Sequence, residues 1–338
     1  MPLPSEWTLD MTMQRLSPDT VISYAKSIVI WLEALDVNSI VWDNVSIEVA
    51  QMFIQMLYKQ NVSDGTIRLR IIHIQEFYKW ALNKKYIKRL PFEIKKRSIK
   101  NLLQTAPALN LPKKPNRKVK AQSDKDFDNV LAANPRKSTA LNKRDEIIAE
   151  IARYMGLRRS EVANLTKEQF LNLDPNEDIL FIEIVTAKSR GRIDSVLVPK
   201  LLLKKILQYI NIERATLIKT LKKNNFDYQE PSALFLNERG KNKGQALDSD
   251  YIGDTWRRSA NLAGIESRFH DNRSSFATNA AKLAREHGEN AKALVKDLLR
   301  HKTEDSAHFY VEFEKMESDT LMRARLINDA YNKEQNGK

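Results

Sequence analysis

Near its C-terminus the chain reads Leu298-Leu299-Arg300-His301-Lys302-Thr303-Glu304-Asp305-Ser306-Ala307-His308-Phe309-Tyr310, which places His301 nine positions before Tyr310. Neither side chain is needed to complete an apolar helix face. A tyrosine phenol has a reference pKa near ~10 and is mostly protonated at neutral pH, so it is an unusual nucleophile. If Tyr310 attacks a substrate, residues elsewhere in the chain must supply positive charge and proton transfer.

The composition describes a basic globular protein. A chain of 338 residues with 42% hydrophobic and 29% charged residues is expected to form two domains. Lysine and arginine total 56 against 43 aspartate and glutamate, and this net charge of +13 points to nucleic acid as the partner. A merely basic surface is the alternative. Between Lys84 and Lys120 thirteen residues are basic and one, Glu93, is acidic, which favours contact with phosphates.

Several classes of protein are disfavoured by the sequence. The absence of cysteine excludes a disulfide framework, a thiolate metal site and a cysteine nucleophile. No apolar run approaches the roughly 20 residues of a membrane span, since Lys204 and Lys205 interrupt the apolar region 196–210. The first ten residues lack the pattern of a secretory signal. We therefore expect a cytoplasmic protein without membrane contact, associated with the nucleoid if the source is prokaryotic.

The first domain is predicted to be all-helical and to cover residues 17–90, after an N-terminal extension over residues 1–16. Ser17-Pro18 suits a helix start, and apolar residues then recur at spacings of three and four in three successive segments. The third segment carries Arg68 and Arg70 near its start, so it is a candidate element for a DNA groove. An ordinary polar helix face is the alternative reading of these two arginines.

A basic linker over residues 91–122 and a second domain over residues 123–338 are expected next. The linker contains four prolines and much of the basic run. Ser123 resembles a helix cap, a long helix is predicted from about Arg144 to Gly156, and residues 178–198 have the alternation of a β-hairpin. Helices follow, the last over residues 316–331. The fold class is thus mainly α with a small antiparallel β-sheet.

Five further side chains of the second domain could carry chemistry with Tyr310 or support it. Arg158 follows the helix-ending Gly156, and Glu161 lies three positions on, close enough to orient Arg158 or a neighbouring imidazole. His270 and Arg273 share a face if a helix begins there. Each signal is weak alone, because a surface arginine and a structurally satisfied histidine are the commoner readings. Lys188 closes the first strand of the hairpin.

In combination, this order of arginine, hairpin lysine, His-x-x-Arg, histidine and tyrosine resembles the tyrosine recombinases, the phage-integrase and Xer class of DNA strand-exchange enzymes. Gly156-Leu157-Arg158-Arg159-Ser160-Glu161 resembles the first arginine motif of the family. His270-Asp271-Asn272-Arg273-Ser274-Ser275-Phe276-Ala277-Thr278 resembles its His-x-x-Arg box. The resemblance implies a two-domain DNA clamp, with a SAM-like core-binding domain over 17–90 and a catalytic domain over 123–338. It implies these catalytic residues: Arg158, Lys188, His270, Arg273, His301 and Tyr310.

The chain departs from the family pattern at two positions, and some roles stay open. Arg300 replaces the usual glycine before the histidine, and Asn272 replaces the usual leucine before the second arginine. Arg300 is expected either to alter the backbone turn or to contact DNA, while His308 is expected to be solvent-exposed or to support the site from outside. The candidate DNA contacts, beyond the catalytic residues, are Arg68, Arg70, Arg159, Arg190, Arg192 and Arg300.

The resemblance also implies a mechanism. Tyr310 would form a 3′-phosphotyrosine, and Lys188 would protonate the departing 5′ oxygen. Strand transfer would then need no ATP, cofactor or metal, and the histidines lack the i,i+4 ligand spacing of a metal site.

The implied partner is double-stranded DNA with specific core sites, bound by a homo-tetramer whose protomers are monomers or weak oligomers when free. The final helix would dock on a neighbouring protomer, or else pack within its own chain. A topoisomerase of type IB and a non-catalytic DNA-binding protein are the alternative functions. The target site, any accessory proteins and the outcome as integration, excision or resolution are left open by the sequence.

Overall fold

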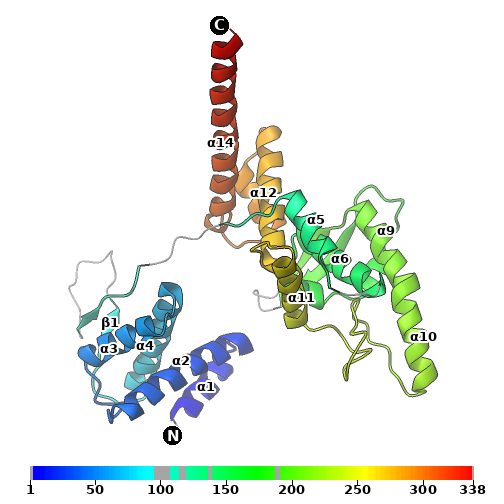
Figure 1. Ribbon diagram of the computed structural model, residues 1–338. Coiled ribbons are helices and arrows are strands. Elements are labelled where there is room, and N and C mark those ends of the chain that lie inside the picture. Colours follow the sequence, from blue (N-terminus) through cyan, green and yellow to red (C-terminus); the bar gives the residue numbers. More distant parts are fainter. Residues whose placement is uncertain (1–2, 95–106, 114–118, 136–138, 187–190, 337–338) are drawn as a thin grey trace. The chain divides into compact units, whose positions relative to one another are not determined.

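The computed structural model describes residues 3–94, 107–113, 119–135, 139–186 and 191–336, and it divides into two compact units. The first unit covers residues 1–116 and the second covers residues 117–338. Figure 1 shows helices as the dominant elements of both units. The expected fold class, mainly α with a small antiparallel sheet, is confirmed. Among the described residues no helix is long and apolar enough to cross a membrane.

In its described residues, the first unit contains four helices and one short strand pair. They are α1 (Leu3–Met13), α2 (Pro18–Val37), α3 (Ile47–Lys59), α4 (Asp64–Asn83), β1 (Glu93–Ile94) and β2 (Ala108–Leu109). Ser17 and Ser63 cap α2 and α4, because each hydroxyl accepts a hydrogen bond from a backbone N–H in the first turn. The strands β1 and β2 pair in parallel, which the sequence analysis did not predict.

Aromatic side chains fill the core of this unit. Trp31 is fully buried between α2 and its neighbours, and its Nε1 donates to the Tyr78 hydroxyl at 3.1 Å. That hydroxyl in turn donates to the Trp42 carbonyl oxygen at 2.8 Å. Both polar atoms of this buried pair are therefore satisfied, as a buried tryptophan and tyrosine require.

The first boundary differs from the sequence expectation, because residues 3–13 are not an extension apart from the domain. They form α1, whose Trp7 is 4% exposed and packs edge-to-face on Phe77 with ring centroids 5.3 Å apart. Asp10 of α1 accepts hydrogen bonds from Trp80 Nε1 at 2.9 Å and lies 2.9 Å from Lys84 Nζ. The apolar contact of Trp7 with Phe77 and the hydrogen bond from Trp80 to Asp10 thus hold α1 on α4.

The second boundary differs as well, because part of the expected linker belongs to the first unit. Phe92 and Leu109 are each 1% exposed and lie in the same apolar cluster as Trp31. The Glu93 backbone N–H donates to the Pro107 carbonyl oxygen at 2.8 Å. The two ends of the segment 91–109 are therefore fastened to the helical core, and the second unit begins after residue 116.

The second unit contains the predicted hairpin and a set of helices. Its elements are α5 (Asp124–Ala132), α6 (Thr139–Tyr154), α7 (Arg159–Ala163), α8 (Glu168–Leu171), β3 (Phe181–Val185), β4 (Ile193–Leu197), α9 (Lys200–Tyr209), the π-helix η1 (Ile210–Arg214), α10 (Ala215–Asn224), α11 (Ser249–Leu262), α12 (Phe269–Glu286), α13 (Ala291–Leu298) and α14 (Asp305–Asn336). Strands β3 and β4 are antiparallel, with Val185 opposite Ile193. Their inward residues Ile182, Ile184 and Val196 are buried, which confirms the alternation predicted from the sequence.

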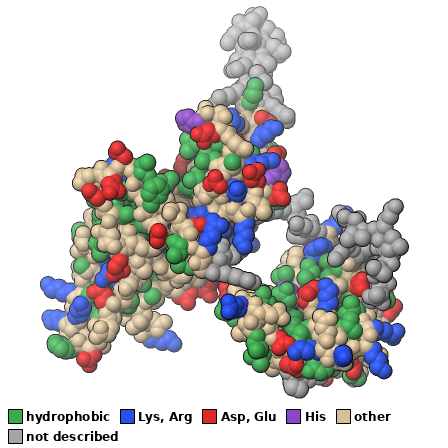
Figure 2. Space-filling model, turned by 180° about the vertical axis from the view of Figure 1, so that it is seen from behind, with side chains coloured by type: hydrophobic (Ala, Val, Ile, Leu, Met, Phe, Trp, Pro, Cys, Tyr) green, Lys and Arg blue, Asp and Glu red, His purple; other side chains and the backbone are tan. Residues whose placement is uncertain are grey.

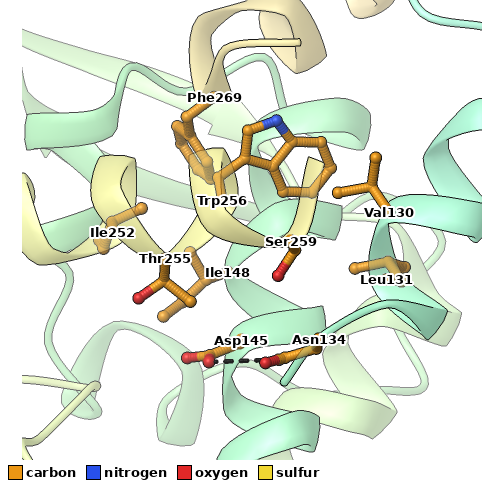
Figure 3. Close-up of a pocket in the computed structure, with 10 residues that line it drawn as sticks. All are labelled: Val130, Leu131, Asn134, Asp145, Ile148, Ile252, Thr255, Trp256, Ser259 and Phe269. Atoms are coloured by element: carbon orange, nitrogen blue, oxygen red, sulfur yellow. Dashed lines mark hydrogen bonds between the residues drawn. The ribbon is translucent and has the colours of Figure 1, made fainter. Parts of the chain in front are cut away.

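A small apolar pocket marks the junction of α5, α6, α11 and α12 (Figure 3). The Trp256 ring lies edge-on to Phe269, with centroids 6.1 Å apart and planes at 84°. At the polar end of the pocket, Asn134 Nδ2 donates to Asp145 Oδ2 at 3.4 Å. This junction positions α12, the helix that carries His270 and Arg273, against α6.

Charged side chains are spread over both units rather than confined to one stretch. Figure 2 shows Lys and Arg intermixed with Asp and Glu on the visible face of each unit. Helix α14 continues well beyond α12 in Figure 1. Its first turns pack on α12 and α13, where Ala307 and Tyr310 join the apolar cluster of Ala281 and Leu299.

Replacement of Trp7 by alanine tests whether α1 is part of the first domain. The loss of a buried aromatic side chain is expected to lower the free energy of unfolding of this unit by roughly 3–5 kcal/mol. Four of the five tryptophans, at positions 7, 31, 42 and 80, lie in this unit, so urea denaturation followed by tryptophan fluorescence reports mainly on it.

The matched control is Leu9→Ala, because Leu9 lies on the same helix and is 59% exposed. Its effect is expected to stay within about 0.5 kcal/mol. Equal effects of the two substitutions would contradict the packing of α1 on this core.

Candidate active site

The first arginine motif begins at a turn that only glycine fits. Gly156 ends α6 with φ of +63°, and a Cβ there would lie 2.5 Å from a ring carbon of Phe276. The chain then enters the short helix α7, for which Arg158 is the N-terminal cap residue. This turn directs the Arg158 and Glu161 side chains to the same side of the unit, where they form an ion pair.

Glu161 is the centre of the site. Its side chain is fully buried, and Oε2 accepts a hydrogen bond from the Arg158 backbone N–H at 2.8 Å. Oε1 accepts from Arg158 Nη1 at 2.7 Å, and Oε2 also accepts from Arg300 Nη2 at 3.0 Å. Burial alone would raise the pKa of Glu161, but the Arg158 N–H and the Arg300 and Arg158 guanidinium groups hold that pKa below its ordinary value.

Arg273 joins this cluster from α12. Its side chain is 1% exposed, and Nη1 lies 3.7 Å from Glu161 Oε2. Nη1 donates to the Gly156 carbonyl oxygen, and Nη2 donates to the Leu299 carbonyl oxygen at 2.6 Å. Arg273 therefore ties the turn after α6 to the end of α13.

The site carries a surplus of positive charge. Three guanidinium groups, those of Arg158, Arg273 and Arg300, surround the single carboxylate of Glu161, so these four side chains sum to +2. Burial and repulsion by Arg158 and Arg300 lower the pKa of Arg273 to about 9, so Arg273 stays charged at neutral pH. Such a preorganised cluster suits a group on which negative charge develops.

His301 approaches the cluster from the turn between α13 and α14, and Tyr310 approaches it from the first turns of α14. Their rings lie with centroids 6.3 Å apart and planes at 26°. Tyr310 is 3% exposed, and it lies close enough to Arg273 to oppose, in part, the lowering of the pKa of that guanidinium by burial and by the neighbouring arginines. The His301 backbone N–H donates to the Lys296 carbonyl oxygen at 2.8 Å, which closes the end of α13.

His270 reaches Tyr310 from another direction. An open pocket of about 280 Å³ is lined by His270, Ser274 and Tyr310, together with Asp271, Arg268, Lys120 and Val119. Sequence reasoning missed Lys120 and Arg268 as site residues. Their signals were present, because Lys120 ends the basic run and Arg268 stands two positions before His270. Lys120 Nζ pairs with Glu266 at 2.6 Å.

The structure thus brings together five of the six predicted catalytic residues: Arg158, His270, Arg273, His301 and Tyr310. Lys188, the sixth, and Arg190 lie outside the described residues. The strands that flank them are closed by a hydrogen bond from the Thr186 N–H to the Arg192 carbonyl oxygen at 2.9 Å. The Arg192 side chain itself donates to Asp194 at 2.6 Å.

The predicted DNA contacts fall into different environments. The Arg159 side chain is 43% exposed and pairs with Asp250 at 2.7 Å, in a space that exists because position 253 is glycine. Arg68 donates to the Pro112 carbonyl oxygen at 3.2 Å, so part of its donor capacity serves the fold of the first unit. The Arg300 side chain is 4% exposed and faces the protein interior.

His308 and Asn272, the two other positions discussed from the sequence, differ in their exposure. The His308 side chain is 47% exposed and lies 3.8 Å from Glu312. Asn272 is fully buried, and neither polar atom of its amide has a hydrogen-bond partner in the described part of the chain.

Comparison with known proteins shows the family to which the chain belongs. The phage integrase family model matches residues 124–317, which is more than half of the chain. The chain belongs to the phage integrase family. The N-terminal SAM-like domain of phage integrases matches residues 6–85, a range that begins within α1 and agrees with the packing of that helix. As a member of this family the chain is a tyrosine recombinase, an enzyme that cleaves and rejoins DNA.

Relatives of this integrase-family member are distant in sequence. The tyrosine recombinase XerC of Alcanivorax borkumensis is 24% identical over 270 residues, which cover 79% of this chain and 76% of the relative. The tyrosine recombinase XerC of Bacillus licheniformis is 25% identical over 174 residues, covering 51% of this chain and 50% of the relative.

Solved structures share the fold. The XerH site-specific recombinase bound to palindromic difH substrate has a TM-score of 0.63 at 19% identity, covering 90% of this chain and 79% of that one. A lambda integrase dimer bound to a COC′ core site has a TM-score of 0.60 at 13% identity, covering 91% and 76%.

Replacement of Glu161 by glutamine tests the electrostatic centre. The substitution leaves three guanidinium groups, two of them buried, without the Glu161 counter-charge, so the second unit is expected to lose about 3–5 kcal/mol of its free energy of unfolding at pH 7. A carboxyl group whose pKa is lowered by folding stabilises the fold above its unfolded pKa, near 4.5, and this stabilisation is lost as the pH falls toward the folded pKa. The difference between wild type and Glu161→Gln should therefore shrink below about pH 4.5.

Urea denaturation, with hydrogen exchange of α12 peptides as the readout, measures the difference in free energy of unfolding between wild type and Glu161→Gln at several values of pH between 7 and 3. The matched control is Glu146→Gln on α6, whose side chain is 42% exposed and pairs with Lys205 at 3.1 Å. A difference for Glu161→Gln that is small at pH 7, or that grows on acidification, would contradict the assigned role.

Proposed function

We propose that Tyr310 is the nucleophile of this recombinase and that it attacks a DNA phosphodiester. The phenol oxygen forms a bond to phosphorus, the bond from phosphorus to the 5′ oxygen breaks, and a 3′-phosphotyrosine and a free 5′ hydroxyl result. The reverse reaction with another 5′ hydroxyl rejoins the strand, so the energy of the broken bond is retained. The observation that carries the proposal is the approach of Tyr310 to a buried arginine cluster with a charge of +2.

Arg158 and Arg273 are proposed to stabilise the transition state. Negative charge accumulates on the nonbridging oxygens of the phosphate, and planar guanidinium groups bind such oxygens while staying charged. Arg158 is suited to direct contact, because 19% of its side chain is exposed. Arg273 is held in place by two backbone carbonyl oxygens and adds its charge from within.

His270 and His301 are proposed to donate hydrogen bonds to the phosphate or to receive the phenolic proton. Support comes from their positions near Tyr310, because His270 lines a pocket with it and the His301 ring lies beside its ring. An imidazole exchanges protons near neutral pH, which suits either role.

Lys188 is proposed as the general acid that protonates the departing 5′ oxygen. The support is its place in the family pattern and its position in the sequence between β3 and β4. A lysine side chain is ordinarily protonated at neutral pH, so a lysine can supply the proton without a metal ion.

The bound DNA is proposed to be a duplex with paired core sites, held by four protomers during recombination. The support is a lambda integrase tetramer bound to a Holliday junction, which has a TM-score of 0.58 at 12% identity and covers 89% of this chain and 77% of that one. The projecting part of α14 is proposed to dock on a neighbouring protomer. Candidate DNA contacts outside the catalytic cluster are Arg68, Arg70, Arg159, Arg190 and Arg192.

A nicked duplex tests the chemistry. Duplexes that the protein retains are first selected from fragmented DNA of its source, and a nick is then placed beside the cleavage position so that the cut strand is lost. Wild type is expected to form a covalent protein–DNA adduct visible on a denaturing gel, with a 5′ hydroxyl on the released fragment. Tyr310→Phe should form none, because the nucleophilic oxygen is absent.

Tyr154→Phe is the matched control, since Tyr154 ends α6 and is 47% exposed. This variant should form the adduct at the wild-type rate. An adduct that persists in Tyr310→Phe, or relaxation of supercoiled DNA without any preferred site, would overturn the proposed mechanism.

Lys120 offers a test of phosphate contact beside the nucleophile. If Lys120 in the Tyr310 pocket binds one backbone phosphate, Lys120→Gln should reduce the slope of log affinity against log salt concentration by about 1. Fluorescence anisotropy of a labelled core-site duplex between 50 and 200 mM salt, roughly the range where such contacts are resolved, measures the slope. The control Lys219→Gln removes an exposed lysine of α10, and a change of the same size there would refute the specific contact.

A further inference from the structure

We propose that Arg300 is a positioning residue that locks the turn carrying His301 onto Glu161 and thereby sets the geometry of Tyr310 cleavage. The proposal rests on the proposed function of Tyr310. Arg300 has φ of +56°, a left-handed conformation that glycine adopts freely and that other residues rarely adopt. Arg300 follows the cap residue of α13, and its N–H and that of His301 bond to the Asp297 and Lys296 carbonyl oxygens, the usual way in which a left-handed residue ends a helix.

The Arg300 side chain adds hydrogen bonds of its own to the backbone bonds that close the end of α13. Nη2 donates to Glu161 Oε2 at 3.0 Å and to the Gly156 carbonyl oxygen at 3.4 Å. Nη1 donates to the Leu298 carbonyl oxygen at 3.3 Å, within its own turn. Because the side chain is 4% exposed and both terminal nitrogens bond to the protein, the guanidinium is committed to the fold rather than presented to DNA.

Arg300 and Arg273 share two acceptors, the Gly156 carbonyl oxygen and the Glu161 carboxylate. Both side chains donate to the Gly156 carbonyl oxygen, but Arg300 lies 3.0 Å from Glu161 Oε2 while Arg273 lies 3.7 Å from it. The closer guanidinium satisfies more of the carboxylate charge. Because Arg300 offsets the Glu161 carboxylate, that carboxylate does not cancel the positive potential of Arg273 near Tyr310.

The backbone on either side of Arg300 is held by the same network. Arg273 Nη2 binds the Leu299 carbonyl oxygen at 2.6 Å, and the His301 N–H binds the Lys296 carbonyl oxygen at 2.8 Å. Arg300 adds a link between this turn and the turn after α6, 139 positions away along the chain. Loss of that link is expected to let the His301 ring move relative to Tyr310, and displacements of about 1 Å in a reacting geometry can cost ~100-fold in rate.

The Arg300→Gly variant is suited to the test, because glycine accepts the left-handed conformation and the turn can still form. Single-turnover formation of the covalent adduct on the nicked core-site duplex gives the cleavage rate, and fluorescence anisotropy gives the Kd for the uncut duplex. The expected result is a cleavage rate about 10- to 100-fold lower with Kd changed by less than about 2-fold. Guanidinium chloride at millimolar concentration should restore part of the rate, and the same concentration of sodium chloride should not.

Two controls separate this proposal from the proposed function. Wild type must form the Tyr310-dependent adduct, and its failure to do so refutes the proposed function. Given that adduct, the positioning role is overturned by a wild-type cleavage rate in Arg300→Gly, or by a loss that lies wholly in Kd. Arg257→Ala, which removes an arginine that is 67% exposed on α11, should leave the cleavage rate unchanged.

Discussion

A carboxylate buried without counter-charges would not stay ionised in a protein interior, and the burial of Glu161 therefore dictates what surrounds it. Its oxygens bind Arg158 within the same turn and Arg300 from a distant one, while Arg273 stands 3.7 Å away on α12. Three segments separated in sequence meet because they share this one acceptor and the neighbouring Gly156 carbonyl oxygen. The active-site geometry follows from that shared requirement.

Charge balance distinguishes this cluster from the structural ion pairs of the same unit. Arg144 is equally buried, yet it is neutralised by Asp145 at 2.8 Å and further bonded to the Leu236 carbonyl oxygen and the Tyr251 hydroxyl. The four side chains of the Glu161 cluster keep a net charge of +2, which the negative charge of a DNA phosphate can partly neutralise. Burial of an arginine alone therefore says little about function, whereas an uncompensated surplus beside a nucleophile is informative.

In the first unit, local sequence patterns predicted a domain that is shorter than the one in the structure. The N-terminal residues had one notable side chain, Trp7, and residues 91–122 were rich in proline and basic residues, so both were set apart from the helical core. Trp7, Phe92 and Leu109 instead complete that core from outside the predicted boundaries. A single apolar side chain has no periodicity to reveal it, and its burial becomes evident only when its partners are known.

The sequence by itself determined the helical periodicities, the hairpin and the order of the reactive residues, since spacings of two and of three to four report local geometry directly. It also identified Tyr310 and its candidate partners through the family pattern. Only the tertiary structure decided that Arg300 points inward to Glu161, that Lys120 and Arg268 line a pocket with Tyr310, the proposed nucleophile, and that Arg273 is held by carbonyl oxygens of two turns. These contacts join residues far apart in the chain, and no local spacing encodes which distant acceptor a buried guanidinium will find.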